Sequence, residues 1–262
     1  MAHKRRRLRQ TTRRTRTRRT LALVAAVAAL ATAAIILILH PWSPAASQPR
    51  ALIADSLSED YPNQALINRI ARILEEAGYK VDIYVNESVD LDLYARLTNY
   101  NLIILRVHGG KAVYRGPDGK LHKINGLFTG LPWRQEYMEL KREWLATRAY
   151  PYNMNKTYLA VLPRFFQQKL HGTFKPGTVM IVASCYSLYT TQIADVLAEK
   201  GLSAFIGWRG PVTLQHMDEA LEKLVEKAIG DHEPWPQAVA EVNRELGPDP
   251  LYNETLKIIV YK

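Results

Sequence analysis

Two stretches of this sequence decide its fold: Tyr100-Asn-Leu-Ile-Ile-Leu-Arg-Val-His108-Gly109-Gly110 and Val179-Met-Ile-Val-Ala-Ser-Cys185-Tyr-Ser187. Each is a short apolar run, rich in β-branched residues, that ends in a chemically reactive side chain. Apolar runs without polar alternation are typical of strands covered on both faces in a parallel sheet. In open α/β sheets, ligands bind beyond the carboxyl ends of the strands. We therefore expect His108 and Cys185, the only Cys of the chain, to meet at one site.

The segments around these two runs alternate between short apolar stretches and stretches with helical spacing. Strands are expected at 51–55, 80–85, 101–107, 177–184, 203–208 and 256–261, and helices at 61–77, 91–97, 189–200, 214–229 and 235–246. An alternating β-α-β order predicts an α/β fold with a parallel sheet and right-handed crossovers.

Residues 111–172 interrupt this order as an insertion. Residues 111–122 alternate around Gly116-Pro-Asp-Gly119, which predicts a β-hairpin. The rest is rich in aromatic residues, and we expect it to be irregular, with two short helices near 136–147 and 157–168. An insertion of this length is often a lid or a binding loop. The equal alternative is a satellite subdomain whose aromatic residues pack on themselves.

The basic charge of the chain is concentrated at its start. Residues 1–20 form a basic arm that holds ten of the 35 Lys and Arg residues and no acid. Without this arm the chain is neutral, although its overall formal charge is +10. The charge therefore gives no support for a nucleic-acid partner of the folded part.

Residues 21–39 are uncharged and apolar, and as a helix they would span roughly 28 Å, close to the hydrocarbon thickness of a bilayer. We expect a single-pass anchor in the cell membrane, with the N-terminus in the cytoplasm and the C-terminal domain outside. A signal peptide cleaved at Ala45-Ala46-Ser47 is the alternative, but the apolar run is longer than a typical signal core. Residues 40–50 are expected to be a linker, and residues 51–262 one domain.

The two strand ends carry a family resemblance. A hydrophobic block that ends in His108-Gly109, followed by one that ends in Ser184-Cys185, resembles the caspase-like (clan CD) cysteine peptidases, which include caspases, metacaspases and CHAT domains. Ser184-Cys185-Tyr186-Ser187 is similar to the Ser-Cys-His-Ser of metacaspases, and residues 194–212 resemble the segment that follows the Cys in CHAT domains. The resemblance covers roughly residues 51–246, apart from the insertion. It implies a three-layer α/β/α caspase-like fold with a mostly parallel central sheet.

The resemblance also implies peptide-bond hydrolysis through a thioester acyl-enzyme. Cys185 would attack the scissile carbonyl, and His108 would act as general acid and base. The backbone N–H groups of Gly109 and Cys185 would stabilise the oxyanion. Glycine also makes sense at 109 because a residue without a Cβ lets the backbone approach a substrate closely.

Three residues are implied as substrate-binding by the same resemblance: Asp55, Trp208 and Arg209. Trp208-Arg209 matches a Trp-Arg pair that follows the corresponding strand in caspases. Arg209 would favour an acidic substrate residue before the cut, and Asp55 a basic one. If the two pair with each other, the pocket would be small and neutral. Ala183 stands where metacaspases have an acid, so their basic specificity does not transfer directly.

Other functions remain open. A glutamine-amidotransferase or α/β-hydrolase arrangement would use His216 or His232, but the residues around Cys185 lack the two elbow glycines. His171-Gly172 is a rival His-Gly pair that does not follow a strand-like run. The chain could also be a non-catalytic caspase-like scaffold at the cell surface, or a protein that cuts itself at Arg50 or within the insertion.

The expected partners are a peptide or protein substrate and the membrane. No metal-ligand cluster, phosphate-binding loop or dinucleotide fingerprint occurs in the sequence, so no cofactor is expected. The substrate, any activation step and the oligomeric state are left open by the sequence.

Overall fold

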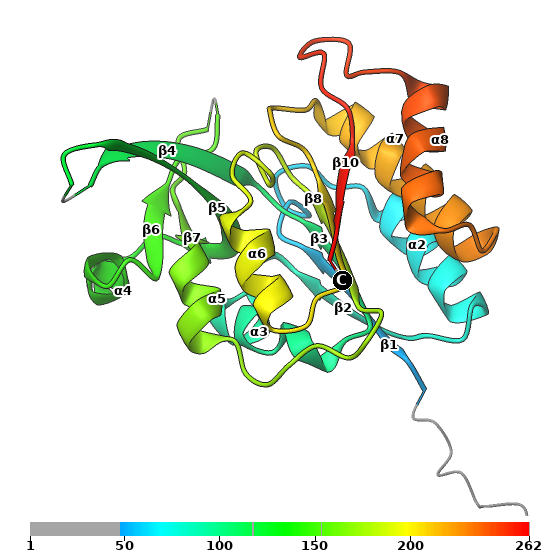
Figure 1. Cartoon of the computed structure of the whole chain (residues 1–262), viewed down its shortest axis with the longest axis horizontal. Coiled ribbons are helices and arrows are strands. Elements are labelled where there is room, and N and C mark those ends of the chain that lie inside the picture. Colours follow the sequence, from blue (N-terminus) through cyan, green and yellow to red (C-terminus); the bar gives the residue numbers. More distant parts are fainter. Residues whose placement is uncertain (1–47, 117, 153, 262) are drawn as a thin grey trace, which may run out of the picture. The chain divides into compact units, whose positions relative to one another are not determined.

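A six-stranded sheet forms the centre of the computed structural model, which describes residues 48–116, 118–152 and 154–261. Its strands, in sheet order, are β2 (Lys80–Val85), β1 (Arg50–Asp55), β3 (Leu102–Arg106), β8 (Val179–Ala183), β9 (Ala204–Gly207) and β10 (Lys257–Val260). The first five are parallel, and β10 runs antiparallel to β9 (Figure 1). The six strands expected from the apolar runs are confirmed, as is an α/β fold with a mostly parallel central sheet.

Helices cover both faces of this sheet (Figure 1). One face packs against α2 (Gln64–Glu76), α7 (Leu214–Val225), the π-helical turn Glu226–Gly230 and α8 (Trp235–Leu246). The other face packs against α3 (Leu91–Ala95), α5 (Pro163–Lys169) and α6 (Gln192–Glu199). Short 3₁₀ turns lie at Asn86–Ser88, Leu97–Asn99 and Gln135–Tyr137.

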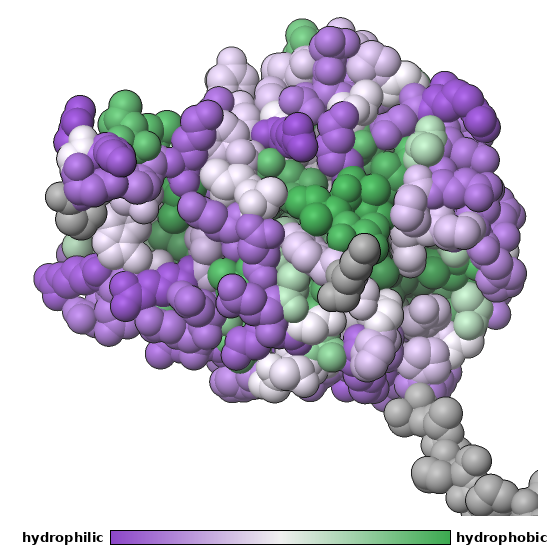
Figure 2. Space-filling model, in the orientation of Figure 1, coloured by the Kyte–Doolittle hydropathy of each residue, from purple (hydrophilic) through white to green (hydrophobic). Residues whose placement is uncertain are grey.

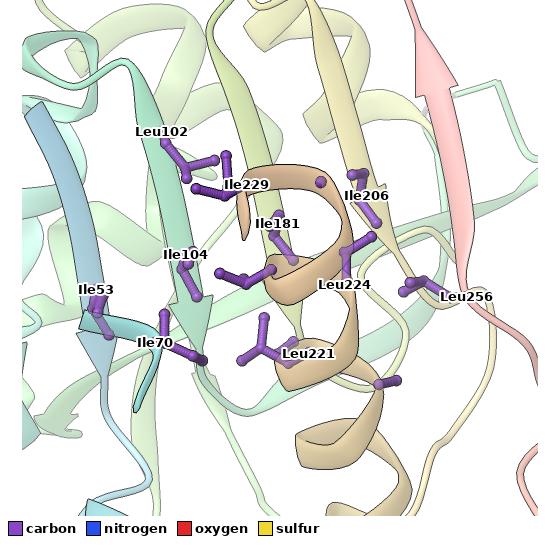
Figure 3. Packing of buried hydrophobic residues seen from close by; sticks show 14 of the residues in the cluster. Ile53, Ile70, Leu102, Ile104, Ile181, Ile206, Leu221, Leu224, Ile229 and Leu256 are labelled. Carbon is purple, nitrogen blue, oxygen red and sulfur yellow. The ribbon is translucent and has the colours of Figure 1, made fainter. Parts of the chain in front are cut away.

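Alternation along the strands divides the core into two layers. Ile104 and Ile181 face α7, where they pack near Leu221 and Leu224 (Figure 3). Their neighbours Ile103 and Val182 belong to the layer on the other face. Because both faces are buried, the strands have the continuous apolar character that the sequence displays.

The insertion is a second sheet rather than an irregular segment. Its four strands are antiparallel, in the order β4 (Gly109–Arg115), β5 (Leu121–Pro132), β7 (Tyr158–Val161) and β6 (Ala146–Ala149). The hairpin predicted at 111–122 is confirmed as part of β4 and β5, which are longer.

The two helices expected in the insertion are mostly wrong. Only α4 (Met138–Arg142) forms within 136–147, because Ala146–Ala149 pairs with β7. The helix expected over 157–168 begins at Pro163, because Tyr158–Val161 form β7 and Leu162 is the N-cap of α5. Pairing with β5 and β6 outweighs local helix preference there, as tertiary contacts often do.

The N-terminal predictions concern residues outside the described part. The basic arm and the apolar segment 21–39 lie there, as does most of the linker. Within residues 48–261, apart from 117 and 153, no helix is long and apolar enough to cross a membrane.

Candidate active site

The register of the central sheet brings His108 and Cys185 to matching positions on neighbouring strands. Arg106 pairs with Ala183 in the parallel ladder between β3 and β8. The Val107 N–H continues the contact by donating to the Ala183 carbonyl at 3.1 Å. His108 and Cys185 each lie two residues further on, so alternation directs both toward the face that packs against α2 and α7. The expected adjacency of the two strands is confirmed, and that His108 and Cys185 act at one site stays a prediction.

Gly109 holds the two strand ends in close backbone contact. A Cβ built on Gly109 would lie 2.2 Å from the Cys185 carbonyl oxygen and 2.1 Å from Ser184 Oγ, so only glycine fits. The Phe128 N–H donates to the His108 carbonyl at 2.9 Å, which makes His108 a hydrogen-bonded position of the β4–β5 ladder. Since such positions alternate, the Gly109 N–H points away from β5.

Aromatic rings surround the imidazole of His108. Its ring centroid lies 6.0 Å from Tyr61, 5.7 Å from Phe128 and 6.2 Å from Tyr158. The Nε2 atom is buried and has no hydrogen-bond partner among the described residues. Burial lowers the pKa of His108 to about 4; the Asp60 carboxylate opposes this shift. The imidazole is therefore neutral at neutral pH and able to accept a proton.

The thiol of Cys185 contacts the segment that follows β9. Its Sγ lies 3.4 Å from both the backbone nitrogen and the backbone oxygen of Val212. Burial raises the pKa of Cys185, and the negative charge of Asp249 adds to this, while the hydrogen bond with Val212 opposes it. No hydrogen bond joins Cys185 to His108 in the described part of the chain. In the resting state the thiol of Cys185 and the imidazole of His108 are thus both uncharged.

The second sheet positions the segment that follows Cys185. Asn125 of β5 is buried, and its amide donates to the Ser187 carbonyl at 2.8 Å and accepts from Thr190 Oγ1 at 2.6 Å. The Ser187 hydroxyl in turn accepts from the Trp208 N–H at 3.0 Å. Tyr186 has a φ of 58°, a left-handed conformation that non-glycine residues seldom adopt. The insertion therefore supports the candidate site directly.

Asp55 pairs with Arg106. The alternative in which Asp55 pairs with Arg209 and leaves a small neutral pocket is therefore wrong. The Asp55 carboxylate is buried and accepts from Arg106 Nη1 at 2.9 Å. Arg106 also donates to both carboxylate oxygens of Asp218 on α7, at 2.8 and 2.9 Å. Burial raises the pKa of Asp55 despite the nearby guanidinium. Asp55 therefore belongs to a buried ion network.

Trp208 and Arg209 are separated from this network. Trp208 is fully buried, and its Nε1 has no hydrogen-bond partner in the described structure, so its expected contact with substrate is not available in this conformation. Arg209 is exposed and lines a groove of about 370 Å³ with Val239, Leu256 and Ile258. This groove belongs to an apolar surface where β10 and α8 meet (Figure 2).

A larger cavity than this groove lies elsewhere, at the carboxyl ends of β1 and β3. It has a volume of about 590 Å³, and its lining includes Asp60, Tyr61, Asn63, Arg106, Leu214, Asp218, Glu219 and Glu222. Among these, sequence reasoning missed Arg106 and Asp218 as members of the site. The one signal in the sequence was Arg106 itself, a charged residue inside the apolar run that ends at His108. A charge in a buried strand requires a partner, but the sequence does not say which one.

Among the described residues, no group of three or more His, Cys, Asp and Glu side chains is arranged to hold a metal ion. The chemistry that this site offers is that of a thiol nucleophile, an imidazole base and backbone N–H donors. No protein-family model matches the chain, and no curated protein matches its sequence.

Proposed function

We propose that this protein is a caspase-like cysteine endopeptidase in which Cys185 and His108 act as a catalytic dyad. The observation that supports this most strongly is their matching position on two adjacent strand ends, with the backbone of Gly109 against that of Cys185. The imidazole of His108 is unprotonated at neutral pH, and its Nε2 has no hydrogen-bond partner among the described residues, so this atom is open to a proton although burial makes it a weak base.

The proposed reaction begins when Cys185 Sγ attacks the carbonyl carbon of the peptide bond. The thiol proton passes to His108, since the thiol is not ionised in the resting state. The carbonyl oxygen becomes an oxyanion that accepts hydrogen bonds from the N–H groups of Gly109 and Cys185. His108 then returns the proton to the leaving amine, and a thioester remains. Water, deprotonated by His108, releases the acid and restores the thiol.

The low pKa of His108 suits the base role more than the acid role. An imidazole with a pKa of about 4 is unprotonated through the neutral range but is a weak base, and the pKa of the thiol is raised, so the first proton transfer is unfavourable until bound substrate changes the surroundings of both groups. Substrate must also displace the contact between Cys185 and Val212. We therefore propose that the resting site is uncharged and that the dyad is completed on binding.

The second candidate is a non-catalytic caspase-like binding domain. The observation in its favour is that Cys185 hydrogen-bonds to Val212 and packs against the apolar layer of α2, α7 and α8. A small buried hydrophobe at a strand end would have the same surroundings. This candidate predicts a folded protein that cuts no peptide.

Anchoring through residues 21–39, with the domain outside the cell membrane, is proposed from the sequence alone. Protease digestion of intact cells tests this orientation. In intact cells, protease added outside should digest the C-terminal domain and spare an epitope placed before residue 20. Digestion of the epitope and protection of the domain would contradict this orientation.

The activity test uses the full chain and four proteins: wild type, Cys185→Ala, His108→Ala and His171→Ala. Each is incubated with a mixed peptide library, and new termini are identified by mass spectrometry. His171 is the matched control, because it is followed by glycine, as His108 is, but is itself exposed. Cuts by wild type and His171→Ala alone would support the dyad. A folded wild type without any cuts would favour the binding domain.

A further inference from the structure

The 590 Å³ cavity is not lined by His108 or Cys185 themselves, but two of its lining residues connect it to the proposed dyad. On one side it is lined by Tyr61, whose ring centroid lies 6.0 Å from that of His108. It is also lined by Leu214, which is two residues after Val212, whose backbone contacts Cys185 Sγ. A peptide held across His108 and Cys185 would therefore have one side chain within reach of this cavity. Its volume falls within the ordinary range of small-ligand sites, roughly 300–1,000 Å³.

The charge of the lining favours a cation. Four of the lining residues are acids, namely Asp60, Asp218, Glu219 and Glu222, and the only base is Arg106. Two of these acids have basic partners outside the lining: Asp60 with Lys156 and Glu222 with Arg69. Glu219 has no ion pair among the described residues and is exposed at the cavity. The lining therefore keeps an excess of negative charge.

Arg106 cannot reverse this preference, because its guanidinium is already occupied. Its Nε and Nη2 donate to Asp218, its Nη1 donates to Asp55, and its Nη2 also donates to the Tyr61 carbonyl at 3.1 Å. An acidic ligand would find at most one remaining N–H of the five that arginine carries. The buried network itself holds two carboxylates against one guanidinium. A cation in the cavity would lower the cost of that excess buried charge.

We propose that this cavity receives a cationic side chain, Arg or Lys, of the substrate residue that precedes the scissile bond, and that Asp218 and Glu219 determine this specificity. The proposal rests on the peptidase function argued above. It replaces Asp55 and Arg209 as the residues that select the substrate. Asp55 acts only through Arg106, and Arg209 lines a separate groove.

The decisive variant is Glu219→Lys, since Glu219 is exposed and its replacement leaves the buried network intact. Wild type should cut after Arg or Lys, and Glu219→Lys should lower the rate of those cuts by about tenfold or more through like-charge repulsion. Glu219→Gln should give an intermediate loss. Glu199→Lys on α6 is the matched control, because it makes the same charge change at an exposed site outside the cavity.

Two readouts separate this proposal from the peptidase function. The first is the residue before each cut in a peptide library. The second is binding of N-acetyl-arginine amide and N-acetyl-glutamate amide to the Cys185→Ala full chain, measured by NMR titration. Selective binding of the arginine amide that Glu219→Lys weakens would support the cationic cavity even if no peptide were cut, and the peptidase function would then be wrong.

Two results would overturn the proposed specificity for a cationic side chain. Cuts that follow acidic or apolar residues at rates unchanged by Glu219→Lys would overturn the cationic cavity and leave the peptidase function standing. Absence of both cutting and selective binding would overturn the two together.

Discussion

The α-carbon of Gly109 lies directly against the carbonyl group of Cys185, where a Cβ on residue 109 would stand 2.2 Å from the oxygen. Real Cβ atoms do not approach backbone this closely, so the contact requires glycine. It links the residue after the proposed base to the proposed nucleophile. Whatever the domain does, these two strand ends are fixed to each other.

Gly109→Ala should therefore both destabilise the protein and disturb the site. Overpacking of this kind costs about 1–3 kcal/mol, because backbone rather than a flexible side chain must move. Urea unfolding gives the free energy, and peptide cleavage gives the activity. Gly230→Ala is the control, since the only atom within 4 Å of its added Cβ is a side-chain methyl of Ile73 at 3.9 Å. Equal stability of the two variants would contradict the contact.

The protonation state of Cys185 gives a second prediction. Burial and the charge of Asp249 raise the pKa of the thiol, so the unreactive thiol form should dominate at neutral pH. Iodoacetamide should alkylate Cys185 slowly at pH 7, and the rate should rise with pH with a midpoint above that of free cysteine. The same measurement is made on His108→Ala. This variant should have nearly the same midpoint of alkylation rate against pH, because no hydrogen bond joins Cys185 to His108 among the described residues.

A rate plateau beginning below pH 7, lost in His108→Ala, would instead indicate a thiolate–imidazolium pair. That outcome would contradict a neutral resting site. The chain has a single Cys, so mass spectrometry of the intact protein reports on Cys185 alone.

The central sheet could be predicted from the sequence because its strands are buried on both faces. Val179–Ala183 is apolar throughout, and its partner Leu102–Arg106 is apolar except for one residue. Such continuity identifies a strand without any knowledge of its neighbours. The order of helices and strands then predicts the parallel pairing of β3 with β8, the strands that precede His108 and Cys185.

The second sheet and the cavity could not be predicted in the same way. Tyr158–Val161 is a strand only because β5 and β6 pair with it on either side. The partner of Arg106 lies 112 residues away on α7, at a position whose helical pattern looks like any solvated face. The charge of Arg106 within an apolar run indicates that it has a partner, but long-range pairing leaves no local signal that identifies Asp218 or Asp55 as that partner.

His108 gives a prediction about stability in acid. Its pKa is about 4 in the folded chain against 6.5 ordinarily, so the folded state binds the proton more weakly than the unfolded state. The resulting stability is present above pH 6.5 and is lost as the pH falls through 4. The expected loss is up to about 3 kcal/mol.

His108→Phe should remove that pH dependence while keeping an aromatic ring among Tyr61, Phe128 and Tyr158. Urea unfolding at pH 7 and at pH 4 measures the difference, and His171→Gln serves as the control for an exposed histidine. If wild type and His108→Phe lose the same free energy between the two pH values, the imidazole is not buried in solution as it is here.

Arg106→Met tests the buried network. Removal of the guanidinium leaves Asp55 and Asp218 buried without their shared cation, and breaking such a pair costs about 3–5 kcal/mol. Arg142→Ala breaks an exposed pair with Glu139 and should cost less than about 1 kcal/mol. Urea unfolding at pH 7 compares the two variants.

The pH dependence of the free energy of unfolding shows why Arg106→Met is less stable than wild type. Without the guanidinium, the pKa of Asp55 rises further above its unfolded value, so the folded variant gains relative stability as the pH falls and this carboxylate is neutralised. The stability deficit at pH 7 should therefore shrink at pH 5. The triple variant Arg106→Met, Asp55→Asn, Asp218→Asn should recover much of it at pH 7. A deficit that is the same at both pH values and persists in the triple variant would mean that Arg106 stabilises the fold by packing, with no part for its charge.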